Sequence, residues 1–443
     1  MELTYIHLSD IHFGQESGGR LRIHNDVKER LLVDARNTLD NLGVENANGV
    51  IVTGDIAYSG TKEEYDEAAS YLDKLVVSVG CEKTSVQLVP GNHDVDRSKI
   101  DEITQHLLTE ISTSGEAVLD NCLENKDVRK LLYGRFHAYM PFAEGYDCSM
   151  NGEGGIACDN KVELAPGKYL RFYGLNSALG CSKERDEEGK LLLGARQRVL
   201  PINSGEELVV LSHHPLNWML DKGDALKYIK NRARVFISGH EHMPSVHVQN
   251  VSTGCDMLML AAGATAPPHA SQEYNFTYNI IKFEYDEKTE NIVTRVFPRS
   301  WLDSDKDFTT DTESLGPAPY VYELGCPNFK SPKVLVRKAE LNSKSKVHDE
   351  MKEQEKSTHK VMYDEVRPDS DIEEDYKLIL LKFFRDLSQA QRREVFELLN
   401  VIPAGLTETL TIAQERHVVD ALKVEGRLAD LRDSIETVLI TKE

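Results

Sequence analysis

The sequence of 443 residues is poor in cysteine and has no long apolar run. Its seven cysteines are odd in number, scattered, and form no Cys-x-x-Cys pair. We therefore expect reduced thiols rather than a disulfide framework. No apolar stretch is long enough to cross a bilayer, and no basic, apolar leader opens the chain. Together these absences predict a cytoplasmic protein without a membrane association.

Basic residues are also in deficit. The chain has 52 lysines and arginines against 73 aspartates and glutamates, a formal net charge of -21. This charge excludes a protein that coats nucleic acid non-specifically, because such proteins need basic faces. It does not exclude a nuclease, since metal ions can hold a scissile phosphate locally. The length predicts two or three domains with a large core.

What the chain does have is a series of metal-ligand residue types, each just past a short apolar run. At the end of a strand, residues i and i+2 point to the same side, so Asp10 and His12 can reach one ion. His7 has the opposite parity and is interpreted as a core or supporting histidine. The motifs, in chain order, are Asp10-Ile-His12, Gly54-Asp55, Gly91-Asn92-His93-Asp94, His213-His214-Pro215 and Gly239-His240-Glu241-His242.

This set combines hard oxygen ligands, several imidazoles and a carboxylate able to bridge, which is what two adjacent divalent metals require. With all five motifs in order, residues 1–326 resemble the calcineurin-like metallophosphoesterases. The resemblance implies an α/β fold in which two mixed sheets form a sandwich flanked by helices. It also implies that Asp55 bridges two metals, one bound by Asp10, His12 and His242 and the other by Asn92, His213 and His240.

The resemblance further implies attack on phosphorus by a metal-bridging hydroxide. His93 would be a non-ligand imidazole that protonates the leaving oxygen or stabilises charge on the transferring group. Asp94 is a candidate to orient His93, while His214 and Tyr58 are candidates for contact with substrate or for support of the ligands. Manganese is the expected metal, with iron, zinc and magnesium as alternatives.

The segment Gly54-Asp-Ile-Ala-Tyr-Ser-Gly60 narrows the choice of substrate class. Protein Ser/Thr phosphatases of this superfamily have an Asp-Arg-Gly block there, which this chain lacks. The segment looks more like the bacterial cyclic nucleotide phosphodiesterase-like branch. We therefore expect a phosphodiesterase for a nucleotide-type substrate, cyclic nucleotide or nucleic acid; the alternative is a phosphomonoesterase.

Alternating apolar runs and amphipathic stretches predict α/β layering, with a helix over residues 63–79 and strands over residues 3–8, 50–52 and 86–89. Residues 97–160 interrupt this rhythm with two predicted helices, 100–111 and 118–140. Their position straight after the Gly91-Asn92-His93-Asp94 motif predicts an insertion that caps the site; the alternative is a helical embellishment far from the substrate. Residues 261–271 are expected to form a loop near the last metal motif.

The last part of the sequence, residues 327–443, lies outside this resemblance. Residues 327–371 have the charge-dense composition of a linker, and residues 372–443 follow a helical pattern in which Ser388 is the expected N-cap of one helix. This module resembles small death-fold adaptor bundles, some of which accompany effector enzymes in bacterial conflict systems. A dimerising helical hairpin is the alternative. The module predicts a protein partner or a homo-oligomer, and a partner-activated effector or nuclease in antiviral defence is a further functional alternative.

Overall fold

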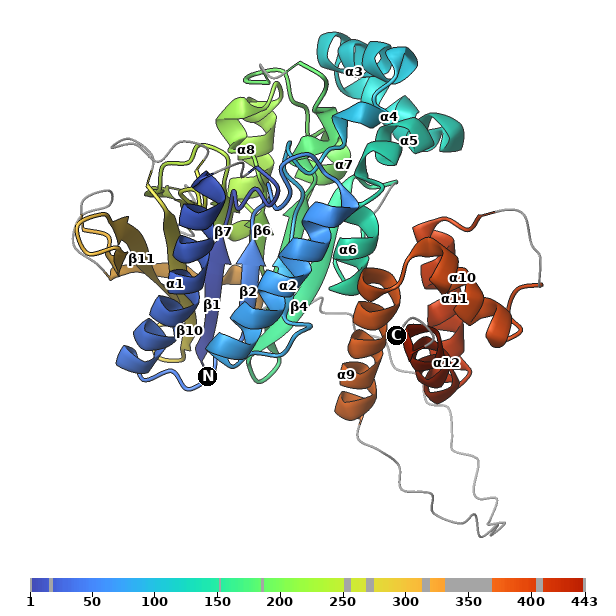
Figure 1. Ribbon diagram of the computed structural model, residues 1–443. Helices are drawn as coiled ribbons and strands as arrows, with labels where there is room; N and C mark the ends of the chain where they lie inside the picture. The colour runs from blue at the N-terminus through green and yellow to red at the C-terminus, as the bar shows by residue number, and fades with distance from the viewer. Residues whose placement is uncertain are drawn as a thin grey trace, which may run out of the picture.

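Two mixed sheets pack face to face in the computed structural model (Figure 1). The rings of Tyr5 and Phe172, one from each sheet, meet edge to face with centroids 5.0 Å apart in the buried core between them. This arrangement confirms the predicted sandwich. The structure describes residues 2–15, 19–150, 153–184, 187–250, 256–267, 275–312, 319–330, 369–403 and 409–440. The predicted linker, residues 327–371, lies mostly outside these ranges.

The first sheet has the strand order β12-β11-β10-β1-β2-β3, and β13 pairs with β11. Strands β1, β2 and β3 are parallel, whereas β10 is antiparallel to β1. The strands are β1 (Glu2–Leu8), β2 (Gly49–Val52), β3 (Val86–Leu88), β10 (Thr277–Asp286), β11 (Asn291–Leu302), β12 (Asp307–Thr310) and β13 (Tyr320–Gly325).

The second sheet has the order β4-β5-β6-β7-β9-β8. Strands β5, β6, β7 and β9 are parallel, and the two edge strands are antiparallel to their neighbours. The strands are β4 (Ile156–Ala165), β5 (Lys168–Leu175), β6 (Glu206–Leu211), β7 (Ala233–Ser238), β8 (Ser245–Gln249) and β9 (Met257–Ala261).

Helices cover the outer faces of the sandwich. Helices α1 (Gly19–Asn41) and α2 (Lys62–Val79) lie on the first sheet (Figure 1). The buried Asp34 carboxylate of α1 accepts hydrogen bonds from Tyr278 of β10 and Arg299 of β11, which fixes α1 to that sheet. On the second sheet, α8 (Lys222–Lys230) packs against β7, and α7 (Ala195–Arg198) lies beside α8. The periodicity predicted α2, but not α1.

Parallel strands of both sheets carry the metal motifs. The ends of β1, β2 and β3 lead into Asp10, Asp55 and Asn92, and the ends of β6 and β7 lead into His213 and His240. Carboxyl ends of parallel strands lie at one edge of a sheet, where α/β proteins place ligands. The fold therefore brings motifs that are far apart in sequence to a common edge.

The segment after β3 is helical, as predicted, but its second helix is not continuous. Residues 118–140 were expected to form one helix, and the structure breaks them into shorter pieces. Asn125 ends one helix and caps the next, because its side chain accepts the amide hydrogens of Asp127 and Val128. The helices are α3 (Glu102–Ser114), α4 (Glu116–Glu124), α5 (Lys126–Tyr133) and α6 (Tyr139–Gly145), with short 3-10 turns η1 (Arg97–Lys99) and η2 (Gly134–Phe136).

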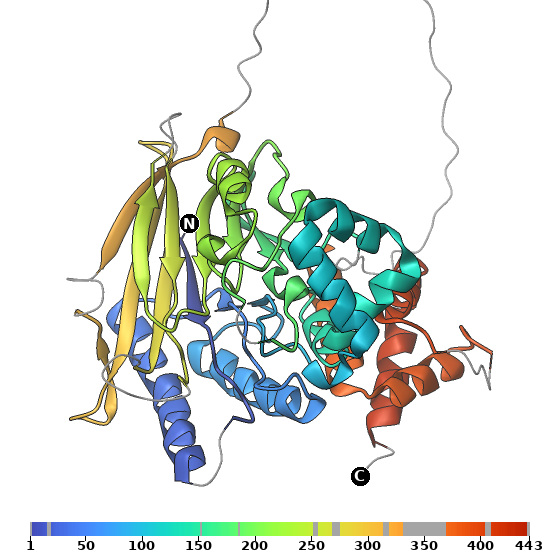
Figure 2. The same ribbon diagram turned by 90° about the horizontal axis from the view of Figure 1, so that it is seen from above.

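Helices α3, α4 and α5 stand beyond the carboxyl ends of the strands (Figure 1). Seen from above they lie to the side on which the C-terminal helices are found (Figure 2). Strand β4 begins at Ile156, so the helical part of the insertion ends before the predicted limit of residue 160. Within the ranges that the structure describes, no helix is long and apolar enough to cross a membrane.

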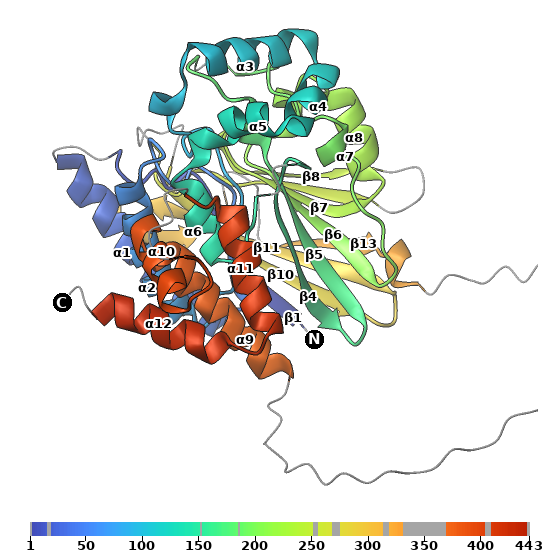
Figure 3. The ribbon, with the colours of Figure 1, turned by 90° about the vertical axis from the view of Figure 1, so that its right-hand side faces the viewer.

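The C-terminal helices form a bundle with its own buried core rather than a hairpin. Aromatic and aliphatic side chains, among them Phe383, Phe396, Val419 and Ile435, fill this core. The side chain of Ser388 accepts the amide hydrogen of Gln391 and caps a helix, as predicted. The elements are α9 (Asp369–Leu380), the π-helical turn η6 (Leu381–Asp386), α10 (Gln389–Leu398), α11 (Ile412–Val424) and α12 (Leu428–Ile440), which lie beside α2 and α6 (Figure 3).

The separate core of the bundle makes a prediction. Phe396→Ala removes a fully buried ring and should destabilise the C-terminal helices by about 3–5 kcal/mol. Both tryptophans, Trp218 and Trp301, lie in the sandwich and report on it alone. Circular dichroism at 222 nm should therefore show an early thermal transition that tryptophan fluorescence does not. Leu398→Ala, at a half-exposed position of the same helix, is the control; a shared shift in both signals for Phe396→Ala would contradict separate cores.

Candidate metal centre

Asp55 lies at the centre of the candidate site, and its two carboxylate oxygens have different surroundings. Oδ1 accepts the backbone amide hydrogen of His93 at 2.8 Å. Oδ2 lies 3.1 Å from His12 Nε2 and 3.4 Å from His213 Nε2. One oxygen is thus fixed by the backbone while the other faces imidazoles from both sheets. That is the arrangement a bridging carboxylate needs.

The first ligand group surrounds Asp10. Its Oδ1 lies 3.2 Å from His242 Nε2, and its Oδ2 accepts hydrogen bonds from Ser9 Oγ at 2.5 Å and from the His240 amide at 3.1 Å. The ligand atoms of Asp10, His12 and His242 all lie within 4.8 Å of one another. The Asp10 carboxylate is therefore oriented by one oxygen and presents the other to the histidines.

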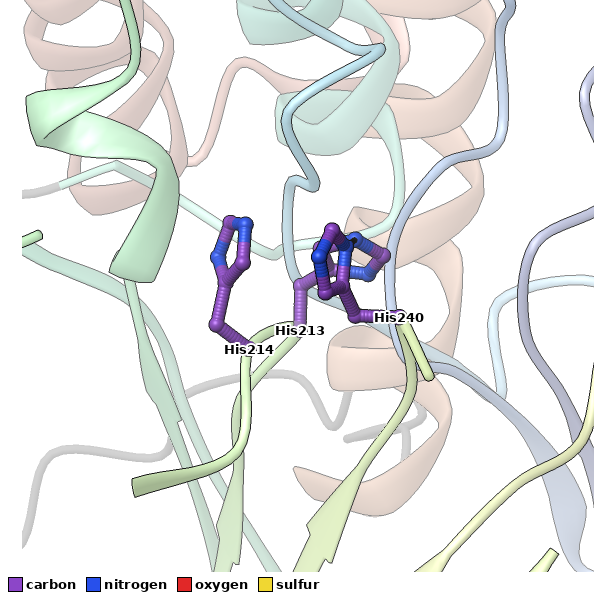
Figure 4. Close-up of side chains that lie close together, drawn as sticks. All are labelled: His213, His214 and His240. Carbon is purple, nitrogen blue, oxygen red and sulfur yellow. Dashed lines mark hydrogen bonds between the residues drawn. The ribbon is translucent and has the colours of Figure 1, made fainter. Parts of the chain in front are cut away.

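The second ligand group surrounds His213. Its Nε2 lies 3.1 Å from Asn92 Oδ1 and 3.1 Å from His240 Nδ1, and Figure 4 shows the rings of His213 and His240 together. His213 Nδ1 donates a hydrogen bond to the Thr53 carbonyl at 2.8 Å. A carbonyl only accepts, so Nδ1 carries a proton and Nε2 is the nitrogen that faces the group and would bind a metal ion. Such backbone partners orient metal-binding histidines.

These separations match what metal coordination requires. Ligands about 2.0–2.2 Å from an ion, at angles between square and tetrahedral, lie roughly 3.0–3.5 Å apart. The distances of 3.1–3.4 Å around Asp55 Oδ2 and His213 Nε2 fall in that range. The two groups of oxygen and nitrogen atoms fit a pair of divalent ions. All seven sequence-predicted ligands are brought together in these groups.

The pKa values of these side chains indicate which proton the metal ions would replace. Burial disfavours the imidazolium of His213, but the carboxylates of Asp55 and Asp10 outweigh it and raise the pKa of His213 to about 10. Burial, then the neighbouring His214 and His213, lower the pKa of His240 to about 2. Burial opposes the charge of Asp55, yet His213 and His93 hold its carboxyl pKa well below the usual range. Without metal, a proton on His213 balances Asp55, and metal binding must displace it.

The backbone at the ligands is unusual. Asp10, His12, Asp55, His240 and His242 all have positive φ values, between 51° and 72°. For residues other than glycine this left-handed conformation is uncommon and costs about 1–3 kcal/mol each where strained. No pattern in the sequence revealed it. In these strained turns, beyond the ends of the strands, alternate side chains point into the ligand groups.

Glycines let these turns approach one another. A methyl group on Gly91 would lie 2.2 Å from Asp55 Oδ1, and one on Gly239 would lie 2.0 Å from Ser9 Oγ. Gly54 combines a φ of +90° with a close approach to His213. Only a residue without Cβ fits at these contacts. These contacts explain why glycine stands beside the ligands in these motifs.

His93 borders the ligand groups, and the structure holds it differently from the expectation. Its Nδ1 donates to the Tyr58 carbonyl at 2.7 Å, and its ring stacks on that of Tyr58 with centroids 5.0 Å apart. Asp94 was the expected partner of His93. Instead the Asp94 carboxylate turns inward, because four donor groups from other residues surround it.

The Asp94 carboxylate is hydrogen-bonded to two of the turns that carry candidate site residues. It accepts the amide hydrogens of Ile56, Ala57 and Gly91 and the hydroxyl hydrogen of Tyr65, at 2.8–3.3 Å. Burial, followed by the nearby Asp55, raises the pKa of this carboxyl to about 6. Asp94 thus joins the turn that carries Asp55 to the turn that carries Asn92 and His93.

The His214 ring lies beside those of His213 and His240, with centroids 4.7 and 4.5 Å away (Figure 4), and its two nitrogens have other partners as well. Its ring is fully buried, with Nδ1 3.0 Å from Ser177 Oγ and Nε2 3.8 Å from Glu187 Oε2. Of its two predicted roles the buried position favours support of the site over contact with substrate. Cys181, Glu187 and His214 also lie within 4.8 Å of one another, and Arg97 neutralises Glu187 across 3.3 Å. Sequence reasoning did not find this buried group, because it has no motif spacing.

The predicted loop after residue 261 supports the first motif. The amides of Thr265 and Ala266 donate to the carbonyls of Ser9 and Asp10, and the Ala266 carbonyl lies 3.4 Å from His12 Nδ1. An open cleft of about 370 Å³ starts at His93. Its walls are formed by Tyr58, Ser59, Thr61, Val95, Asp96, Arg97 and Ser98.

Comparison with known proteins gives the family. Residues 3–244 match the calcineurin-like phosphoesterase family, more than half of the chain. The protein belongs to that family. Residues 375–437 match the GTPase-associated adaptor domain, which coincides with the C-terminal bundle. The phosphoesterase family implies a phosphoric ester hydrolase that uses divalent metal ions, in agreement with the ligand groups.

Individual relatives are distant. The chain is 24% identical to the uncharacterized metallophosphoesterase-like protein YydB of Bacillus subtilis over 279 residues, which are 60% of this chain and 54% of that protein. The chain thus spans about half the length of this curated relative. Among solved structures, the NAD nucleotidase of Haemophilus influenzae is 12% identical with a TM-score of 0.34, covering 71% of this chain and 57% of its own. Purple acid phosphatase PPD1 of yellow lupin is 12% identical with a TM-score of 0.38, covering 74% and 55%.

The close approach of Gly91 to Asp55 makes a prediction about metal binding. In Gly91→Ala the new methyl group must displace the Asp55 carboxylate, so bound manganese should fall well below the wild-type content. Gly134→Ala is the control, because a methyl group there meets nothing within 4 Å and φ is ordinary. Plasma mass spectrometry of the purified proteins after dialysis measures the content. Equal metal content in both variants would contradict the packing argument.

Proposed function

We propose that the protein is a two-metal phosphodiesterase for nucleotide-type substrates. The observation that carries the proposal is the position of Asp55 Oδ2, which faces His12 on one side and His213 on the other. Asp10, His12 and His242 would hold one divalent ion, and Asn92, His213 and His240 the other. When bound, such a pair polarises phosphoryl oxygens and lowers the pKa of water, and manganese is our first expectation for both positions.

His93 is the proposed acid. Nδ1 donates a hydrogen bond to the Tyr58 carbonyl. Nε2 is therefore the nitrogen that can exchange a proton with a leaving oxygen. The stacked Tyr58 ring holds the imidazole plane. Asp94 takes no part in proton transfer in this scheme and positions the turns through its amide bonds.

The cleft beside His93 supports a diester rather than a small monoester. Its volume of about 370 Å³ lies within the usual range for small-molecule sites, about 300–1,000 Å³. Tyr58 and several polar residues, Ser59, Thr61, Asp96, Arg97 and Ser98, line it, which suits a polar and aromatic group such as a nucleoside. A phosphate at the ligand groups would extend its second ester arm into this cleft. A monoester with a small leaving group would leave most of the cleft unused.

A second candidate function rests on the C-terminal bundle. Its match to the GTPase-associated adaptor domain supports a protein partner. The phosphoesterase would then be an effector whose activity depends on that partner. In that case the isolated protein would hydrolyse diesters slowly, and addition of the partner would raise the rate.

Asp55→Asn tests the bridging role. The amide keeps the shape but loses the charge that two cations share, so hydrolysis of bis-p-nitrophenyl phosphate with Mn²⁺ should fall to background. Asp66→Asn, at an exposed position of α2, should leave the rate unchanged. Rates with p-nitrophenyl phosphate measured in parallel distinguish the classes. Full activity of Asp55→Asn would refute the bridge, and a preference for the monoester would favour the phosphatase alternative.

His93→Ala tests the acid role. The variant should keep its metal ions but lose about 10²- to 10⁴-fold in kcat, the usual contribution of a positioned acid or base. The loss should be larger for an alkyl ester than for a nitrophenyl ester, because a poor leaving group needs the proton more. His106→Ala, at an exposed position of α3, is the control. Equal losses for both esters would argue against proton donation by His93.

A further inference from the structure

The C-terminal bundle is attached to the phosphoesterase region by a built contact, which we call the docking face. On the phosphoesterase side it comprises Asp73 of α2 and Glu144, Gly145, Tyr146 and Asp147 at the end of α6. Figure 3 shows the bundle lying against both helices. The face is acidic, and the bundle meets it with arginines.

Arg385 of η6 makes the first part of the contact. Its two terminal nitrogens reach the two oxygens of Asp73 at 2.8 and 3.2 Å, and it donates to the Tyr146 hydroxyl at 3.0 Å. Only 7% of its side chain is exposed. A bidentate pair of this kind, between a buried guanidinium and a partly exposed carboxylate, fixes geometry as well as charge. Gly145 passes close to Arg385, since a methyl group on Gly145 would lie 2.8 Å from Arg385 Cβ.

Arg416 of α11 makes the second part. It bonds Glu144 at 2.6 Å and Asp147 at 2.9 Å, and Glu144 is itself buried. Leu381 of η6 is buried within the core of the phosphoesterase region rather than that of the bundle. Two ion-paired arginines and a leucine of the bundle that is buried in the phosphoesterase core therefore hold the bundle in one orientation.

A chain of contacts leads from the docking face to the catalytic turns. Phe142 of α6 packs on the Tyr65 ring with centroids 5.0 Å apart. The Tyr65 hydroxyl donates to Asp94 at 2.8 Å, and Asp94 ties together the turns of Asp55 and His93. Tyr65, Phe142 and Arg385 all line a cavity of about 470 Å³ between the bundle and the phosphoesterase region. Loss of the docked helices would open this side of both rings to water.

We propose that Tyr65 is a positioning residue through which the docked C-terminal bundle keeps the catalytic turns in order. Docking holds α6, α6 holds the Tyr65 ring, and the Tyr65 hydroxyl holds Asp94. A protein that draws the bundle away from the docking face would therefore lower the turnover number. This inference rests on the proposed phosphodiesterase function.

A double-mutant cycle on the full-length protein tests the link. Tyr65→Phe and Arg385→Glu should each lower kcat for bis-p-nitrophenyl phosphate by about tenfold with little change in KM, in the range of site-to-site coupling. The double variant should be no slower than the slower single variant, because both changes break one link. Arg385→Glu combined with Asp73→Arg should restore docking and kcat. Lys382→Glu, an exposed charge reversal in the same turn, is the matched control.

Hydrogen exchange gives a readout that does not depend on activity. Amides of residues 54–58 and 88–96 should exchange faster in Arg385→Glu and return to wild-type rates in the charge-swapped pair. Multiplicative losses of kcat, or released helices with unchanged exchange at these turns, would overturn the inference. A rise in kcat on release would overturn it too, because the bundle would then be inhibitory. If wild type hydrolyses no phosphodiester, the proposed function fails, while the exchange comparison still decides whether the link exists.

Discussion

The fixed position of one carboxylate, Asp55, is the constraint on which the site depends. The His93 amide holds Oδ1, which leaves Oδ2 facing both ligand groups. An isolated charge in this fully buried place would be costly, and imidazoles or metal ions must balance it. Both sheets contribute to that balance, His12 from the first and His213 from the second. The sandwich architecture thus acts as the frame that brings one anion to two groups of ligands.

The backbone conformations that hold this geometry are locally destabilising. Five of the proposed ligands have left-handed backbones, and three glycine contacts leave no room for a methyl group. Such conformations persist where the surroundings determine them fully. Asp94 contributes to that determination at the turns of Asp55 and His93, since it accepts hydrogen bonds from both turns and from the Tyr65 hydroxyl. Through Tyr65 the same network reaches α6 and the adaptor bundle, so the strained turns and the docked helices share one set of contacts.

Much of the fold and of the candidate site could be predicted from the sequence, because a metal site requires particular residue types at fixed spacings. The strand ends, the seven candidate ligands and the Ser388 cap followed from such local patterns, and the two-sheet fold followed from the family resemblance that the motifs carry. The partner of Asp94 could not be predicted, since it depends on α2 lying against the turns. Helix α1 was missed because its first turn carries no acidic residue. Likewise the break at Asn125 and the Cys181, Glu187 and His214 group arise only from tertiary packing.

The central claim is that Asp55 bridges two metal ions, and electron paramagnetic resonance during a titration with Mn²⁺ tests it most directly. Two ions joined by a carboxylate are exchange-coupled, and their hyperfine lines are more closely spaced than those of a single ion. The account predicts that this coupled spectrum develops as the second equivalent of Mn²⁺ binds to the wild-type protein. A spectrum of isolated Mn²⁺ ions at saturation would contradict the bridge, and with it the arrangement on which the proposed chemistry depends.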